Sequence, residues 1–191
     1  MNYNELKEKV HSNAVNHGFW KERRSNEHCL MLVITEVAEL VEADRNGKIA
    51  NVEWFKRKMQ NSRICQGLDP DISKERGYEV AYNETIKGTP EEEFADIAIR
   101  LLDLAGALGV DFDKMQPCRY YRAYGKFSFT ENAFALCKGL SRDVIGIEKR
   151  IQFGLHYVEN WTKTLGIDLS WHIKQKMKYN ESRPSMHGKK Y

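Results

Sequence analysis

The hydrophobic and polar positions of this chain group into segments of helical length, most of them bounded by residues that start or stop helices. The clearest start is Thr89-Pro90-Glu91-Glu92, with Thr at the N-cap, Pro at the first helical position and Glu at the third. Gly109 is typical of a residue that ends such a helix. The pattern predicts helices at residues 3–17, 27–45, 51–60, 90–108, 111–123, 131–139, 142–164 and 168–181.

The stretch between residues 61 and 88 breaks this pattern. It carries glycine, serine and an Asp-Pro-Asp sequence, which are typical of turns, so we expect it to be mostly loop. No pair of apolar segments joined by a hairpin turn stands out in the sequence. The expected fold class is therefore all-α.

Two glutamates lie within one of the most apolar of the predicted helices, at residues 27–45. Glu36 and Glu39 are three residues apart, which places them about 60° apart on one helix face. Because apolar residues occur nearly all the way round this helix, we expect it to be buried. Ionised carboxylates that are buried without a partner cost several kcal/mol each, so this pair needs an arginine, a lysine or a metal ion.

The helix predicted at residues 90–108 carries a second acidic pair at the same spacing, Glu93 and Asp96. If the two apolar helices pack side by side, four carboxylates would surround one cavity, a donor set that suits Mg²⁺ or Mn²⁺. Arg100 and Asp103 continue the same stripe, which is also compatible with a solvated face or with an Asp96–Arg100 ion pair. On residue types alone a salt-bridged core is the commoner arrangement, and the choice stays open.

Composition narrows the class of protein. Of 191 residues, 30% are charged and 41% are hydrophobic, which is typical of a soluble globular chain. We expect no membrane-spanning segment and no apolar leader. The 4 cysteines form no Cys-x-x-Cys pair, so zinc-knuckle and redox motifs are absent, and we expect a reducing, cytoplasmic environment.

The net charge of +3 is too small by itself to predict binding to nucleic acid. Basic residues concentrate in the last predicted helix and in the basic tail at residues 182–191 that follows it. Lys176, Tyr179, Asn180 and Arg183 lie at i, i+3, i+4 and i+7, on one helix face. Two cations, an amide and a phenol on one face are suited to holding phosphate groups, with a solvated polar face as the alternative.

Five motifs follow one another in the order His17-Gly-Phe-Trp20, Glu36-x-x-Glu39, Glu93-x-x-Asp96, Lys176-x-x-Tyr179-Asn180-x-x-Arg183-Pro184 and His187-Gly-Lys-Lys-Tyr191. Each motif alone has low specificity, but their combination in this order resembles a known family. That family is the MazG-like all-α nucleoside triphosphate pyrophosphohydrolases. The resemblance covers roughly residues 10–110 and 166–191.

The resemblance implies a helical protein that forms a homodimer or homotetramer and uses Mg²⁺. Its reaction converts a ribo- or deoxyribonucleoside triphosphate to the monophosphate and pyrophosphate, which clears unwanted nucleotides from the pool. The implied metal ligands are Glu36, Glu39, Glu93 and Asp96. Glu36 or Glu39 would also act on the attacking water.

The same resemblance assigns contacts with the substrate and its phosphates to Lys176, Tyr179, Asn180 and Arg183. Trp20 and Trp54 are candidates for contact with the nucleobase, and ordinary core packing is an equally good interpretation of both.

The sequence also departs from the compact family pattern. The interval between Glu39 and Glu93 is long, and residues 113–165 are interpreted as an α-helical insertion before the C-terminal helix. We expect a single MazG-like domain over residues 1–191, in which the basic helix reaches the site from its own chain or from a partner subunit. Arg100 stands where some members have a tyrosine that meets the base, so base preference does not carry over.

A competing hypothesis from another class is a non-catalytic helical module. Its carboxylates would form ion pairs in the core, and its basic C-terminal face would bind nucleic acid or a nucleotide. The mild net charge makes nucleic acid the less favoured partner. Mg²⁺ with a nucleotide should stabilise the enzyme by mass action and should not stabilise the module.

Overall fold

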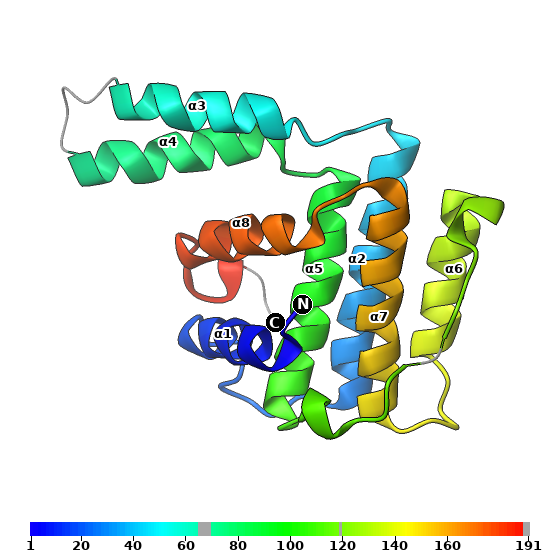
Figure 1. The fold of residues 1–191 in the computed structure, drawn as a ribbon. Coiled ribbons are helices and arrows are strands. Elements are labelled where there is room, and N and C mark those ends of the chain that lie inside the picture. The colour runs from blue at the N-terminus through cyan, green and yellow to red at the C-terminus, as the bar shows by residue number, and fades with distance from the viewer. Residues whose placement is uncertain (65–69, 119, 189–191) are drawn as a thin grey trace.

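The computed structural model describes residues 1–64, 70–118 and 120–188, and within these ranges every regular element is a helix (Figure 1). This confirms the all-α fold class. No helix in the described ranges has both the length and the apolar character of a membrane span. The α-helices are α1 (Tyr3–Asn16), α2 (Asn26–Arg45), α3 (Val52–Ile64), α4 (Pro70–Thr85), α5 (Pro90–Ala107), α6 (Phe129–Leu140), α7 (Ile147–Leu165) and α8 (Leu169–Glu181). Short 3₁₀ turns are η1 (Phe112–Lys114), η2 (Tyr124–Lys126) and η3 (Ser185–Gly188).

Helix α5 occupies the centre of the molecule and begins as its sequence predicts. Thr89 is the N-cap, with its hydroxyl accepting the Glu92 N–H at 3.4 Å, and Pro90 is the first helical residue. The apolar face of α5 is completely covered, as Phe94 and Leu101 show with 0% exposed surface each. Helices α2 and α7 run alongside α5, while α1 and α8 cross it (Figure 1). Helix α5 is therefore the element against which the others are positioned.

The expectation of a mostly loop segment at residues 61–88 is wrong. Helix α4 runs through most of it and forms a hairpin with α3 that projects from the body (Figure 1). Pro70, which suggested a turn, is the first residue of α4, a position where its missing N–H removes no hydrogen bond. Tyr78 and Tyr82 lie on the buried face of this helix. The part of the expected loop at 65–69 lies outside the described residues.

The helix expected at residues 111–123 is also wrong. In the described residues, only the 3₁₀ turn η1 follows Asp111, and the chain then runs without regular structure as far as η2. Pro117 stands in the middle of the expected helix. A proline there lacks the backbone donor that a helix needs, and its ring collides with the preceding turn.

Helices α6 and α7, which lie in the segment 113–165, complete the main core. Trp161 of α7 packs edge-on against Phe94 of α5, with ring centroids 4.9 Å apart. Phe129 of α6 contacts the same tryptophan at 4.8 Å. A smaller apolar cluster joins α3 and α4 to α8. The segment 113–165 thus belongs to the same packed body as α2 and α5.

Candidate functional site

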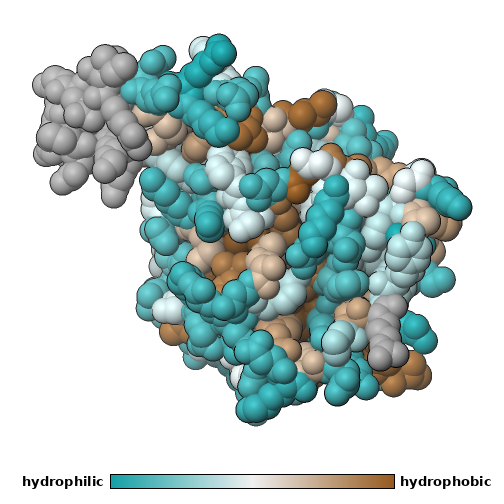
Figure 2. Space-filling view, viewed as in Figure 1, coloured by the Kyte–Doolittle hydropathy of each residue, from teal (hydrophilic) through white to brown (hydrophobic). Residues whose placement is uncertain are grey.

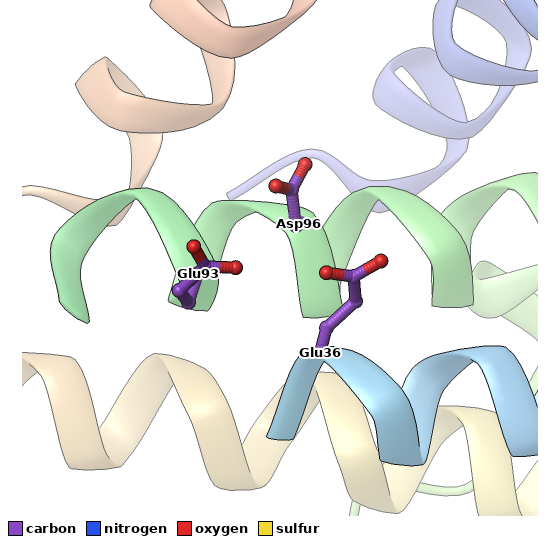
Figure 3. Close-up of side chains that lie close together, drawn as sticks. All are labelled: Glu36, Glu93 and Asp96. Atoms are coloured by element: carbon purple, nitrogen blue, oxygen red, sulfur yellow. The ribbon is translucent and has the colours of Figure 1, made fainter. Parts of the chain in front are cut away.

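Helices α2 and α5 pack side by side, and their contact brings together three of the four predicted acidic ligands. One oxygen from each of Glu36, Glu93 and Asp96 lies within 4.8 Å of the others (Figure 3). Glu93 and Asp96 project from successive turns of α5, and Glu36 approaches them from α2. Glu36 and Glu93 are buried and Asp96 is partly buried. We call these three residues the acidic triad, and its charge is unfavourable unless a cation neutralises it.

Glu93 is the least satisfied member of the acidic triad. Its Oε2 atom is buried and has no hydrogen-bond partner in the described part of the chain. Burial and the negative charges of Asp96 and Glu92 together raise the pKa of this carboxyl to about 9. An orphaned carboxylate oxygen beside two other carboxylates is suited to coordinating a hard divalent cation such as Mg²⁺ or Mn²⁺.

Glu36 has a cationic partner of its own. The Arg100 Nε–H donates to Glu36 Oε1 at 2.5 Å, across the contact between α5 and α2. Burial raises the pKa of Glu36, as does the charge of Asp96, and the Arg100 guanidinium opposes both effects. The ion pair within one helix that the sequence allowed, between Asp96 and Arg100, is therefore replaced by a pair between two helices.

Asp96 is paired with the C-terminal helix of the same chain. The buried Lys176 ammonium lies 2.6 Å from Asp96 Oδ2 and 2.6 Å from Glu92 Oε1. Burial alone would lower the pKa of Lys176, but the two carboxylates outweigh it, so that the net shift is upward. Helix α8 thus reaches the acidic triad within its own chain, one of the two positions that the sequence allowed.

Glu92 is an important residue that sequence reasoning left out of the site. It is 2% exposed and accepts hydrogen bonds from the Tyr82 hydroxyl at 3.0 Å, from the Gly88 N–H and from Lys176. It thereby ties α4, α5 and α8 together beside the acidic triad. The only signal in the sequence was its place three residues after the Thr89 N-cap, which indicated a helix start and nothing more.

Glu39, the fourth predicted ligand, is not part of the cluster. It lies one turn after Glu36 on α2 with an exposed side chain, and it lines the same cavity as the acidic triad. The side of α2 on which it lies is turned toward solvent, since Ala38 and Glu42 are exposed too. The expectation that α2 is buried all the way round holds only for part of the helix.

A cavity of about 360 Å³ extends from the acidic triad to the loop that follows α1, within the range of small-molecule sites. Helices α1, α2, α5 and α8 supply most of its walls. Near the centre of the face in Figure 2, apolar surface shows between polar residues. The lining residues include Val10, Asn13, His17, Phe19, Trp20, Arg24, Cys29, Leu32, Glu36, Glu39, Lys87, Gly88, Glu92, Glu93, Asp96, Ile99, Arg100, Asp103, Lys176, Met177, Asn180 and Arg183.

Three of the four predicted phosphate-binding residues line this cavity and the fourth does not. Lys176, Asn180 and Arg183 face it, and the Oδ1 atom of Asn180 is buried without a hydrogen-bond partner among the described residues. Tyr179 instead stacks on Tyr82 with ring centroids 4.4 Å apart. Its assignment to the substrate is therefore not supported by its position, because its ring packs α8 against α4.

The two tryptophans proposed for the nucleobase have different surroundings. Trp20 lines the cavity, and its indole N–H donates to Asp103 Oδ1 at 2.9 Å. Trp54 is 46% exposed on α3 and lines a separate groove with Val80 of α4. The structure therefore brings Trp20 to the candidate site and leaves Trp54 outside it. Asp103, for which the sequence also allowed a solvent-exposed helix face, lies in the cavity wall.

Comparisons with protein-family models, with curated proteins and with solved structures find no match to this chain.

Proposed function

We propose that this protein is a Mg²⁺-dependent nucleoside triphosphate pyrophosphohydrolase of the MazG-like kind. It would act on nucleotides in the cytoplasm, as a homodimer or homotetramer, and remove unwanted (deoxy)nucleoside triphosphates from the pool. The observation that carries the proposal is the acidic triad in the wall of a cavity that Lys176 and Arg183 also line. Carboxylate-bound divalent ions and Lys or Arg side chains are the two usual means of holding a polyphosphate.

The residues of the acidic triad fit a divalent ion. They offer carboxylate oxygens only, and Glu93 Oε2 lacks any other partner among the described residues. When bound, Mg²⁺ or Mn²⁺ would neutralise phosphate charge and lower the pKa of a coordinated water. Glu36, Glu93 and Asp96 are the residues we assign to holding it.

Glu39 is the better placed of the two candidate bases. It lines the cavity one turn from Glu36 and forms no ion pair with any described residue. Glu36, by contrast, is buried and bound to Arg100. We therefore assign Glu39 to orienting the attacking water and accepting its proton, and Glu36 to the metal.

Lys176 of α8 and Arg183, which follows the end of that helix, would bind the phosphates that the metal does not reach. Both line the cavity, and so does Asn180 of α8. Lys176 is already fixed by Glu92 and Asp96, so its charge is positioned before the substrate arrives. A positioned positive charge of this kind stabilises the negative charge that develops on departing pyrophosphate.

Product analysis tests this function. The full chain is incubated with a panel of NTPs and dNTPs and Mg²⁺, and the nucleotides are separated by ion exchange. We expect monophosphate and pyrophosphate, with both lost in EDTA and in Glu93→Gln and retained in Glu42→Gln, a matched change at an exposed position of α2. Diphosphate with inorganic phosphate would contradict the proposed cleavage site.

One observation favours a second candidate, a module that binds a nucleotide or nucleic acid without hydrolysing it. Arg100 and Lys176 already pair with Glu36 and Asp96, as in a salt-bridged core. Such a module would bind nucleotide equally well with Mg²⁺ or EDTA and would produce no monophosphate. A binding measurement under both conditions distinguishes the two candidates.

A further inference from the structure

Asp103 lies at the part of the cavity that the acidic triad does not reach. It is on α5, seven residues beyond Asp96, so the two carboxylates share a helix face at an axial separation of about 10 Å. Both residues line the same cavity. If the phosphates of a nucleotide lie at the acidic triad, the sugar and base extend along α5 toward Asp103.

The Asp103 carboxylate is fixed through one of its two oxygens. Oδ1 accepts the Trp20 indole N–H at 2.9 Å and also lies 2.7 Å from His11 Nδ1. Within the described ranges Oδ2 takes part in no hydrogen bond, and 22% of the side chain is accessible. Asp103 therefore offers the cavity one acceptor oxygen whose orientation is set before any ligand binds.

The close packing of α1 on α5 allows the contact between His11 and the Asp103 carboxylate. Gly106, one turn later on α5, lies directly beneath His11, and a Cβ atom at this position would overlap the histidine side chain. The absence of a side chain lets α1 approach α5 closely enough for His11 to reach the carboxylate. The cavity lining also includes Cys29, Leu32 and Ile99, which offer little hydrogen bonding of their own.

We propose that Asp103 is a specificity-determining residue that selects nucleotides whose base carries an amino group. This inference rests on the proposed function, because it takes the cavity as the nucleotide site. A carboxylate oxygen can only accept a hydrogen bond. It pairs with the 4-amino group of cytosine or the 6-amino group of adenine, and it repels the carbonyl that uracil and hypoxanthine present at the same place.

Binding of non-hydrolysable nucleotides tests the selection separately from the reaction. The α,β-methylene analogues of dCTP and dUTP are titrated into the full chain with Mg²⁺ by calorimetry. We expect the cytosine analogue to bind roughly tenfold more tightly or better, the scale set by an unmatched buried polar group. The analogue with an unsubstituted 2-pyrimidinone base, which has no amino group, should lose a similar factor without any change to the protein.

The variant Asp103→Asn should bind the dUTP analogue more tightly than the dCTP analogue, the reverse of the wild-type preference. Its carbonyl oxygen can still accept from Trp20 and His11, while its NH₂ group takes the place of Oδ2 and offers a donor to the carbonyl of uracil. Asp44→Asn, the same change at an exposed position of α2, should keep the wild-type preference.

Several outcomes would overturn the assignment of Asp103. These are equal affinity of the wild type for the two analogues, no binding of either, full affinity for the 2-pyrimidinone analogue, or an unchanged preference in a folded Asp103→Asn protein. The pyrimidinone arm needs no variant, so it decides the question if the variant fails to fold. Preferential binding without cleavage of dCTP would refute only the proposed hydrolysis, whereas cleavage without base preference would refute only the role of Asp103.

Discussion

At the scale of single residues, the molecule concentrates its unfavourable electrostatics at Glu93. Its neighbours Glu36 and Asp96 each have a cation of their own, whereas Glu93 has an oxygen buried without a partner in the described ranges. Burying a carboxyl in this way costs free energy unless it is protonated or binds a cation. Glu93 is therefore the member of the acidic triad at which the proposed metal ion should have its largest effect on stability.

If Mg²⁺ binds at the acidic triad as proposed, saturating Mg²⁺ should raise the melting temperature of the wild type, and Glu93→Gln should remove that stabilisation because the amide replaces a charged ligand oxygen. Without metal at pH 7 the change should alter the melting temperature by less than roughly 4 °C, because a carboxyl with a pKa of about 9 is already neutral. Differential scanning fluorimetry with and without Mg²⁺ measures both effects. A variant that keeps the full Mg²⁺ shift would show that the ion binds elsewhere.

His172 gives the free energy of unfolding a dependence on pH. It is 4% exposed on α8, and burial lowers its pKa while the charges of Glu91 and Asp168 oppose that shift. Because the folded protein holds it neutral while the unfolded chain is protonated below about pH 6.5, acidification favours unfolding. Urea unfolding at pH 7 and pH 5 should show a smaller loss of stability in His172→Gln than in wild type. Equal losses in both proteins would mean that other groups account for the acid sensitivity.

At the scale of elements, close helix contacts depend on glycines that face a neighbouring helix. Gly154 of α7 lies over α5, and Gly139 of α6 lies against Phe153 of α7. Glycine is costly within a helix because of its conformational freedom. Its presence at these helix crossings indicates that the space is needed.

Gly154→Ala should therefore destabilise the protein although alanine is the better helix former. An added Cβ would lie 2.7 Å from Leu101 Cδ1 and 3.0 Å from Leu140 Cδ2, both in fully buried side chains. Overpacking of this kind costs about 1–3 kcal/mol, so we expect the melting temperature to fall by roughly 2–12 °C. Gly125→Ala, where no atom lies within 4 Å of the added carbon, is the control and should change it little. An increase in stability for Gly154→Ala would show that the helices can separate freely.

The elements that sequence reasoning found are those whose signals are local. Helix α5 was predicted from its Thr89 cap and the apolar residues that follow, and both are confirmed. Helix α4 was missed because its buried face depends on Tyr78 and Tyr82, whose burial requires contact with α8 at the other end of the sequence. Pro117, whose effect is local, could have excluded the helix expected around it.

The candidate site, like the fold, was predictable from the sequence only where its signals are local. The sequence predicted that Glu93 and Asp96 share a helix face, since three residues separate them, and it placed Glu36 on a second apolar helix. The pairing of Lys176 with Glu92 could not, because it joins residues 84 positions apart through the packing of two helices. The exposure of Glu39 could not be predicted either, because a three-residue spacing between glutamates occurs on buried and on solvent-exposed helix faces alike.

At the scale of the whole molecule, the cavity exists because α1, α2, α5 and α8 meet around it. Lys176 of α8 is the residue that connects the last helix to the acidic face of α5. The basic helix is therefore part of the stability of the protein as well as part of its candidate site. A substitution at Lys176 affects both the stability of the protein and its candidate site. Measuring that variant with and without metal separates the two effects.

We expect Lys176→Met to lower the free energy of unfolding by about 3–5 kcal/mol, because it leaves the buried Glu92 and the partly buried Asp96 without their cation. Mg²⁺ should restore part of this loss by neutralising Asp96. Chemical unfolding in EDTA and in Mg²⁺ measures the difference, with Lys174→Met as a control on the exposed face of the same helix. Similar stability of the Lys176→Met and Lys174→Met proteins in EDTA would contradict the structural role of the buried pair.

The pairing of α5 with α8 also has a consequence during synthesis. A ribosome extends the chain from its amino end, so Glu92 and Asp96 are made at least 80 residues before the lysine that pairs with them, the separation between Glu92 and Lys176 being 84 positions. The nascent chain therefore carries an uncompensated acidic face through much of translation. Any product that terminates before Lys176 lacks both the buried ion pair and one wall of the cavity, so premature release yields a polypeptide with an incomplete candidate site.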